Sequence, residues 1–166
     1  MVKKSVSLIG QIILYGAFAA FIGYFATNPR YEHLAADKAL LKISLSHFGE
    51  QECRDRTPEE LARLAPNMRK KQECQRERSP LTLEVDLDGQ ALYRGVIAPT
   101  GIRKDGIAAV YQRFEVPAGE HKLAVRLNDN TRIQGFPYSK EATLQLKPAQ
   151  IVVVDFNRDK GGLFFN

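Results

Sequence analysis

The sequence predicts a mainly β protein, with a single N-terminal transmembrane helix followed by a seven-stranded antiparallel β-sandwich that carries a short, disulfide-stapled helical insertion. Three observations lead to this prediction: residues 8–25 contain no charged side chain, several later segments alternate apolar and polar residues, and two cysteines flank a highly charged segment. We therefore expect an anchor at residues 1–28, a neck at 29–40 and one exported domain at 41–166, with the helical insertion at 51–79.

The apolar segment is long enough to cross a bilayer. As a helix, residues 8–25 span about 27 Å, which is close to the thickness of the hydrocarbon core. A cleaved signal peptide is the alternative, because a basic start before an apolar segment also begins an export signal. However, the segment exceeds the about 7–15 residues of a signal core, and further apolar residues follow the small residues Ala17 and Ala19. We therefore expect an uncleaved anchor.

The flanking charges predict the orientation of this anchor. Lys3 and Lys4 precede the apolar segment, and positive charge is retained on the cytoplasmic side of membranes. We expect a single-pass protein of the bacterial inner membrane, with a cytoplasmic N-terminus and a periplasmic C-terminal domain. Tyr24, Phe25 and Tyr31 suit the interfacial end of the span, where aromatic rings are enriched.

The anchor also carries a pattern typical of helix packing in membranes. Small residues let helices approach closely, and polar ones form hydrogen bonds across helices. Small residues are also common in any membrane span, so the pattern is compatible with a plain tether. The candidate packing residues are Gln11, Gly16, Ala19, Ala20 and Gly23.

The net charge of +5 raises nucleic acid as a partner. Two observations speak against it: acidic residues are interspersed throughout, and no basic stripe is interleaved with aromatic residues. An exported bacterial domain would also rarely meet nucleic acid. We instead expect the lipid bilayer and integral membrane protein subunits as partners, and no small-molecule substrate.

Most of the predicted strands alternate apolar and polar residues, which places apolar side chains on one face; the exceptions are 91–97, whose face is ambiguous, and 151–156, which is nearly continuously apolar, as in a central strand. They cover residues 41–45, 81–87, 91–97, 109–116, 121–127, 142–146 and 151–156. Asp88 and Gly89 favour a tight type I′ hairpin after the second strand. His47 continues the apolar parity of the first strand, so we expect a partly buried, hydrogen-bonded histidine at its end.

The insertion contains a helix-start signal and both cysteines. Thr57 is followed by Pro58 and Glu60, which predicts a capping box and a short helix that ends by Ala65. Cys53 and Cys74 predict a disulfide in an oxidising compartment, and closing a loop of this size is worth about 3 kcal/mol. The alternative is a metal site that adds His47 or Met68, but the cysteine and histidine spacings of metal motifs are missing.

Two segments resemble a known group of envelope modules. One begins with Val116-Pro117-Ala118-Gly119-Glu120-His121, and the other is Leu144-Gln145-Leu146-Lys147-Pro148-Ala149-Gln150 before an apolar strand. Residues 109–156 are locally similar to PEGA-type and transthyretin-like β-sandwich modules, although Ala149 replaces their usual glycine. The layout as a whole resembles uncharacterised single-pass envelope proteins of proteobacteria. The resemblance implies a binding or scaffolding role and no catalytic residues.

No motif for nucleophilic catalysis, phosphate binding or calcium binding is present in the sequence, so we expect no enzymatic activity and no cofactor. The leading hypothesis is a non-enzymatic accessory or assembly protein of an inner-membrane complex, with a respiratory complex as one candidate host. The alternative is periplasmic copper or haem delivery through His47 with Cys53, Cys74 or Met68.

Protein contacts are expected at loops, because sandwich loops commonly carry recognition. The candidate loops cover residues 99–108 and 128–139, and the apolar tail at 163–165 is a further candidate, with a final edge strand as its alternative. The candidate contact residues are Arg103, Lys104, Phe136, Tyr138, Phe164 and Phe165.

Overall fold

The computed structural model describes residues 2–28 and 34–166, and its chain forms two compact units, Met1–Ala35 and Ala36–Asn166. Strands dominate the second unit, so the prediction of a mainly β protein with one N-terminal apolar helix is confirmed. Residues 29–33 of the predicted neck, Tyr31 among them, lie outside the described residues.

The first unit contains helix α1 (Val2–Thr27). Its segment Val6–Thr27 is long and apolar enough to cross a membrane, with a length of about 33 Å at about 1.5 Å per residue. The large apolar side chains of this segment are exposed within the chain, as expected for a helix whose surroundings are lipid or another helix. The predicted apolar segment 8–25 falls inside it.

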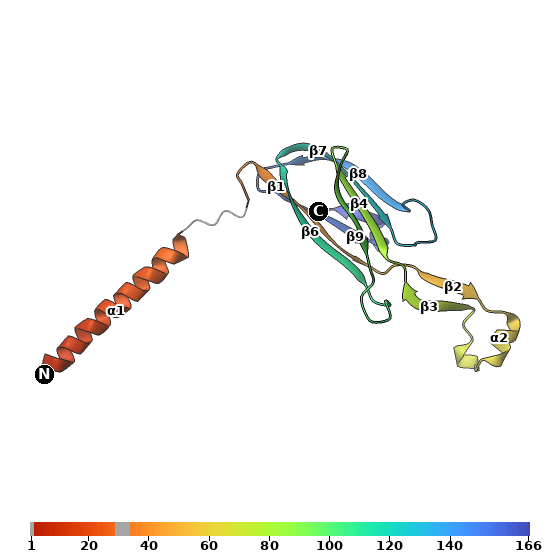
Figure 1. Ribbon diagram of the computed structural model, residues 1–166, viewed down its shortest axis with the longest axis horizontal. Helices are drawn as coiled ribbons and strands as arrows, with labels where there is room; N and C mark the ends of the chain where they lie inside the picture. Colours follow the sequence, from red (N-terminus) through yellow and green to blue (C-terminus); the bar gives the residue numbers. More distant parts are fainter. Residues whose placement is uncertain (1, 29–33) are drawn as a thin grey trace. The chain divides into compact units, whose positions relative to one another are not determined.

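Two four-stranded sheets form the body of the second unit (Figure 1). The first sheet has the order β10 (Gly162–Phe165), β9 (Ile151–Asn157), β1 (Lys38–His47) and β6 (Ala108–Pro117). The second has the order β5 (Gln90–Ile97), β4 (Leu81–Leu87), β7 (Gly119–Asn128) and β8 (Tyr138–Leu146). Neighbouring strands in both sheets are antiparallel, except that β1 runs parallel to β9.

Both sheets contribute to one hydrophobic core. Residues of one parity are buried along β4, β7 and β9, and along β1 with Leu40 as the exception. Each fully buried Leu or Ile contributes about 1.5–3 kcal/mol relative to an exposed position. The largest fully buried side chains are Leu41, Ile43, Leu81, Leu83, Leu123, Leu127, Val85, Val125 and Val154.

The described residues contain ten strands, where the sequence predicts seven. The additional ones are β2 (Gln51–Asp55), β3 (Gln72–Arg78) and β10, whose segment the sequence leaves open as a tail or an edge strand. β2 and β3 are exposed or half-buried at every position, so they carry no apolar alternation that could reveal them. β1 also begins at Lys38, and the last residues of the predicted neck are therefore strand.

We call residues 51–78 the arm. It contains β2, helix α2 (Pro58–Arg63), the 3-10 turn η1 (Pro66–Met68) and β3, and Cys53 lies opposite Cys74 in the register of the two strands. The predicted disulfide between these cysteines is present. No residue of the arm is buried, so its order depends on the disulfide, the strand pairing and polar contacts.

The start of α2 confirms the predicted capping box. The Glu60 N–H donates to the Thr57 hydroxyl at 3.3 Å, and the Thr57 N–H donates to the Glu60 carboxylate at 2.9 Å. Arg54 of β2 pairs with both Glu60 and Glu73, which joins the helix to the two strands. Arg54 also holds the pKa of Glu60 below its ordinary value, mainly by hydrogen bonding to the carboxylate.

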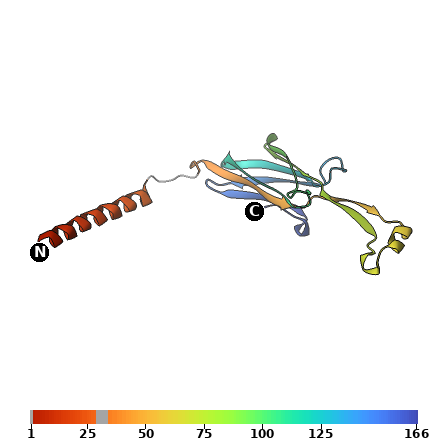
Figure 2. The ribbon, with the colours of Figure 1, turned by 60° about the horizontal axis from the view of Figure 1, so that its bottom comes forward.

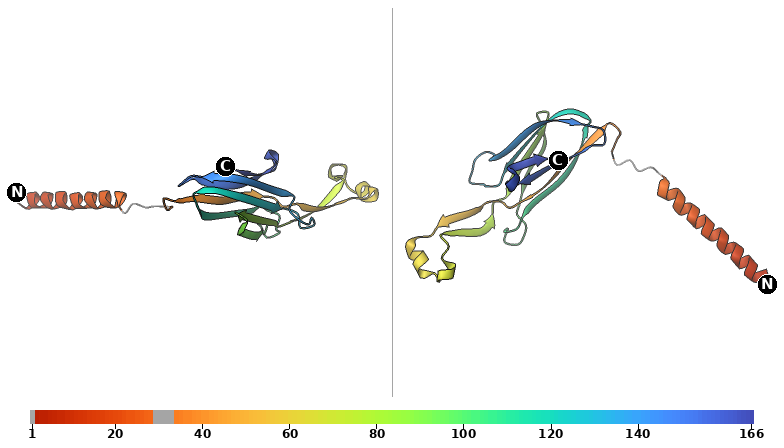
Figure 3. Two further views of the ribbon diagram at one scale, coloured as in Figure 1. Left: turned by 90° about the horizontal axis from the view of Figure 1, so that it is seen from above. Right: turned by 180° about the vertical axis from the view of Figure 1, so that it is seen from behind.

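The body has two different ends. At the end where β1 begins, which we call the base end, the connections are tight turns at residues 88–89, 118 and 147–150. At the opposite end, the loop end, lie the arm and the connections 98–107, 129–137 and 158–161, because β1, β7 and β9 finish there. Figures 2 and 3 show the arm leaving this end of the body from other directions.

Candidate interaction site

Arg78, the last residue of β3, fastens the arm to the body. Its Nε donates to the Asp105 carbonyl and its Nη1 to the Gly49 carbonyl, each at 3.1 Å. Its backbone N–H donates to the Lys104 carbonyl at 3.0 Å. The guanidinium also lies 4.6 Å from the centre of the Phe48 ring, within the range of a cation–π contact. One side chain thus connects the arm, the 98–107 loop and the end of β1.

A close backbone crossing lies beside Arg78. The Ser79 N–H donates to the Glu50 carbonyl at 2.9 Å where the chain enters and leaves the arm. Gly49 is buried at this crossing, and a Cβ placed on it would lie 1.8 Å from the Ser79 carbonyl oxygen. Only glycine therefore fits at this position without a backbone shift.

A buried charge cluster supports the same end of the body. Asp129 is 3% exposed and is the only buried charged residue among those that the structure describes. Its Oδ2 lies 2.9 Å from His47 Nε2 and accepts a hydrogen bond from Arg158 at 3.0 Å. Arg158 also pairs with Glu50, whose carboxylate raises the pKa of the guanidinium. A buried carboxylate requires such partners, so the cluster fixes the loops that carry them.

His47 occupies the position that the strand parity predicts. It ends β1 with its side chain largely covered, and its ring centre lies 4.4 Å from that of Phe156. Its Nε2 lies within hydrogen-bond distance of Asp129. Cys53 lines a surface hollow together with His47, but its sulfur is bonded to Cys74. Met68 lies in η1 of the arm and is exposed.

Among the described residues, no three or more His, Cys, Asp or Glu side chains are arranged to hold a metal ion. With both sulfurs in the disulfide, Cys53 and Cys74 cannot act as thiolate ligands in this form of the protein.

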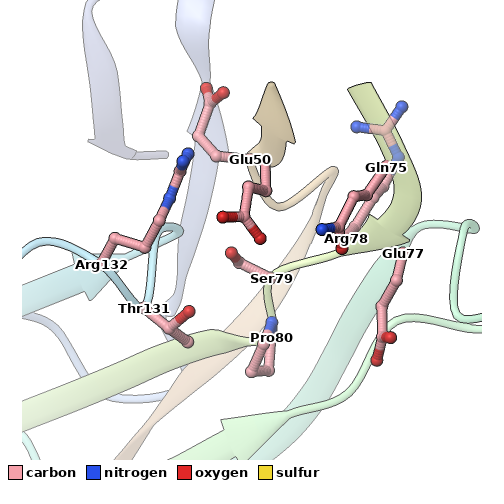
Figure 4. Close-up of a pocket in the computed structure, with 9 residues that line it drawn as sticks. Glu50, Gln75, Glu77, Arg78, Ser79, Pro80, Thr131 and Arg132 are labelled. Atoms are coloured by element: carbon pink, nitrogen blue, oxygen red, sulfur yellow. The ribbon is translucent and has the colours of Figure 1, made fainter. Parts of the chain in front are cut away.

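A hollow of about 250 Å³ opens where the arm meets the 129–137 loop. Figure 4 shows Arg132 on one side of it and Arg78 on the other, with Ser79 and Pro80 between them. Arg132 is held by its Nη2, which donates to the Gln51 carbonyl at 3.1 Å. The lining consists of Glu50, Glu52, Gln75, Glu77, Arg78, Ser79, Pro80, Thr131 and Arg132.

Exposed apolar side chains also gather at the loop end. Phe48, Met68, Ile102 and Ile133 lie in the arm or in the connections next to it, and Ile102 is fully exposed. Basic residues neighbour three of them in the sequence, as in the segments 68–71, 102–104 and 132–133. This end therefore carries exposed apolar side chains beside basic residues.

Of the contact residues predicted in the two loops, three lie in loops and one lies in a strand. Arg103 and Lys104 lie in the 98–107 loop, where Lys104 pairs with Glu77 of the arm at 3.1 Å. Phe136 lies in the 129–137 loop, with its ring centre 5.8 Å from the Arg126 guanidinium. Tyr138, in contrast, begins β8 and packs edge-on against Phe156 at 4.9 Å between ring centres. Tyr138 therefore belongs to the periphery of the core rather than to a free loop.

The apolar tail is strand β10. Phe165 pairs with Val154 in the register of β9 and packs partly buried against the core. The Phe164 ring centre lies 5.0 Å from Lys160 Nζ. The edge-strand alternative for this segment is thus the one that the structure adopts, and the two rings are only half-buried.

The predicted packing residues of the anchor remain accessible. Gln11, Gly16, Ala19, Ala20 and Gly23 are all exposed in α1. A Cβ placed on Gly16 or Gly23 would meet no other atom within 4 Å. Both positions are open to a neighbouring helix.

The sequence did not reveal the most connected residues of the loop end. Glu50, Arg158 and the loop residues Asp129 and Arg132 come from three separate segments and meet only in the folded chain. Asp129 and Arg132 lie within the predicted contact loop 128–139, but their sequence context does not indicate their partners, and each arginine resembles any other surface arginine.

Neither a scan against protein-family models nor a search of curated proteins finds a match for this chain. The class of the protein therefore follows from its own architecture. It has an apolar helix long enough to span a membrane and a mainly β domain whose arm and longer connections lie at one end.

Proposed function

We propose that this protein is a non-enzymatic, membrane-anchored accessory or assembly protein of a bacterial inner-membrane complex, and that it acts by protein–protein contact. The observation that carries the proposal is the asymmetry of the domain. The base end has only tight turns, while the arm and all the longer connections gather at the loop end. Loops held by a rigid β scaffold are a common arrangement for recognition.

The contacts that fix the arm and loops at the loop end support a binding role. Arg78, the Asp129 cluster and the disulfide hold the arm and the neighbouring loops in one arrangement. A surface ordered before binding loses less conformational entropy when a partner docks. The β-sandwich predicted from the sequence would provide the rigid body beneath this surface.

The anchor supports an integral membrane partner. The exposed small residues of α1 would let a transmembrane helix of another subunit approach closely. Lys3 and Lys4 favour a cytoplasmic N-terminus. The disulfide suits a periplasmic domain, because disulfides persist in oxidising compartments.

Mild-detergent purification of the full chain from its native membranes, after chemical cross-linking, tests this role. We expect the protein to migrate with integral membrane subunits, and the double variant Gly16→Leu/Ala20→Leu to lose part of that association. Ile13→Leu, a volume-conserving change in the same helix, is the matched control. Migration of the unaltered protein as a free monomer only would contradict the proposal. Stoichiometric copper or haem on the purified protein would favour the delivery role instead.

A further inference from the structure

The hollow at the base of the arm contains two arginines whose charges no carboxylate of the described chain neutralises. Arg78 and Arg132 contact backbone carbonyls and the Asn130 side-chain oxygen, whereas the nearby Arg158 is paired with Glu50 and Asp129. We propose that this hollow receives a carboxylate side chain from an acidic segment of the partner protein. The inference rests on the proposed function and names the chemistry of its contact.

Both arginines keep donors for a ligand. A guanidinium has five N–H donors in a planar fork that matches a carboxylate. Arg78 uses its Nε and Nη1 on the Asp105 and Gly49 carbonyls, and Arg132 uses its Nη2 on the Gln51 carbonyl and its Nε on the Asn130 side-chain oxygen. The remaining N–H groups can face a carboxylate held between the two side chains.

The hollow is held open before binding. Arg78 is fixed against the Phe48 ring, and Arg132 approaches from the opposite side, on the loop that follows β7 (Figure 4). Ser79, Thr131 and Gln75 add hydroxyl and amide groups to the lining. These groups can form hydrogen bonds with the backbone of an extended segment, which a single ion does not offer.

The acidic residues of the lining favour a polypeptide over an anionic membrane surface. Glu50 is paired with Arg158 and Glu77 with Lys104, whereas Glu52 has no ion pair among the described residues. The unpaired Glu52 repels phosphates and carboxylates alike, so the occupant that fits is one whose charge varies along its length, as in a polypeptide. A peptide can place one carboxylate between the arginines and present its N–H groups to Glu52.

The surroundings of the hollow fit the same partner. Arg103 and the 69–71 segment are exposed basic positions beyond the hollow, and Ile102 and Ile133 provide apolar contacts. Acidic segments with interspersed apolar residues complement such a surface, and the charge attraction would accelerate association.

Heteronuclear NMR of the full chain in detergent micelles tests the hollow directly, because the hollow lies in the unit that contains the hydrophobic core. The probe is a capped hexaglutamate peptide, with capped hexaglutamine as its uncharged counterpart. We expect the Nη–H signals of Arg78 and Arg132 to shift with hexaglutamate only. Arg132→Gln should weaken binding about tenfold, as expected for the loss of a charge-assisted hydrogen bond. Arg113→Gln, an exposed change on β6, should leave the affinity unchanged.

Several outcomes would overturn the inference. Equal shifts with both peptides, no shift at either arginine at millimolar hexaglutamate, or unchanged affinity in a folded Arg132→Gln variant would each exclude a carboxylate site. Competition by vesicles that contain phosphatidylglycerol, with tighter binding than the peptide, would assign the surface to lipid instead. If the full-length Arg132→Gln protein cross-links to its membrane partner as before, this inference fails while the proposed function stands. A free monomer of the unaltered protein contradicts the function itself.

Discussion

At the residue scale, three non-glycine residues among those described, Asp88, Lys104 and Ala149, adopt the left-handed backbone conformation that favours glycine. Ala149 has a φ of 61° in the 147–150 turn, where its N–H donates to the Lys38 carbonyl at 2.8 Å. A side chain in the left-handed region costs about 1–2 kcal/mol.

The Ala149→Gly variant should therefore be more stable than the natural sequence. Relief of the left-handed strain exceeds the extra chain entropy of glycine in the unfolded state, so we expect a gain of about 0.5–1 kcal/mol. Urea unfolding of residues 36–166 measures it. Ala109→Gly, an exposed change inside β6, should destabilise the domain, and a loss of stability in Ala149→Gly would show that the turn carries no strain.

Gly49 is a position where an added side chain should destabilise the domain, because the neighbouring backbone leaves no room for it. Gly49→Ala places a Cβ against the Ser79 carbonyl, so the two crossing chains must separate and the bonds of Arg78 and Ser79 must lengthen. We expect a loss of about 1–3 kcal/mol in urea unfolding, in the range of overpacked interiors. Ser46→Ala, an exposed neighbour in β1, should change stability little. Equal stability of both variants would contradict the close crossing.

At the element scale, the arm differs from the body because it has no buried residue. Without the disulfide, strands β2 and β3 and helix α2 keep only their pairing, the Thr57 cap and the Arg54 contacts. The chain-entropy estimate of about 3 kcal/mol for a loop of this size exceeds what such exposed contacts offer.

We therefore expect the double variant Cys53→Ala/Cys74→Ala to lose amide hydrogen-exchange protection throughout the arm. Core amides such as those of Leu83 and Val125 should stay protected, because these residues belong to the body. Hydrogen exchange read by NMR separates the two regions. Equal loss of protection in the arm and the body would show that the arm is part of one cooperative unit.

Charged side chains cross the strands β5, β4 and β7 on the face opposite the core. Asp86 of β4 pairs with Arg94 of β5 and with Arg126 of β7, and Glu84 also accepts hydrogen bonds from Arg126. Arg94 is the main cause that holds the pKa of Asp86 below its ordinary value. At the hairpin between β4 and β5, His121 lies with its Nδ1 2.6 Å from the Asp88 carboxylate, and this hydrogen bond holds the pKa of Asp88 below its ordinary value.

These shifts predict sensitivity to acid. A carboxylate with a lower pKa in the folded state stabilises the fold above its unfolded pKa, and this contribution is lost as the pH falls through the folded pKa. We expect the melting temperature of residues 36–166 to fall below a pH of about 4. In Asp86→Asn the melting temperature should be lower at neutral pH and depend less on acid. An identical pH profile in this variant would exclude the contribution of Asp86.

At the scale of the whole molecule, the two units differ in what stabilises them. The unit Ala36–Asn166 contains its own core, drawn from both sheets, whereas the apolar side chains of α1 are exposed within the chain. The helix therefore requires a bilayer, detergent or another helix, and the β domain does not.

We expect residues 36–166 to fold alone, with a melting temperature within a few degrees of that of the domain in the detergent-solubilised full chain. Differential scanning calorimetry of both proteins measures this. A fragment that aggregates or melts without cooperativity would show that the anchor contributes to the stability of the domain.

Much of the fold could be predicted because its signals are local. The alternation at residues 81–87 became β4, Asp88 and Gly89 adopt the positive φ angles of a type I′ turn, and Thr57 caps α2 with Glu60. The strands β2 and β3 gave no such signal, because both of their faces are exposed and the disulfide that joins them replaces a buried face.

The sequence by itself determined the apolar helix, the paired cysteines and the apolar faces of the main strands, because each depends on residues close together in the chain. Only the tertiary structure decided that β1 lies parallel to β9, that every long connection emerges at one end, and that Arg78 and Arg132 face one hollow. These features depend on segments that are far apart in sequence, and only the packing of two sheets around one core brings them together.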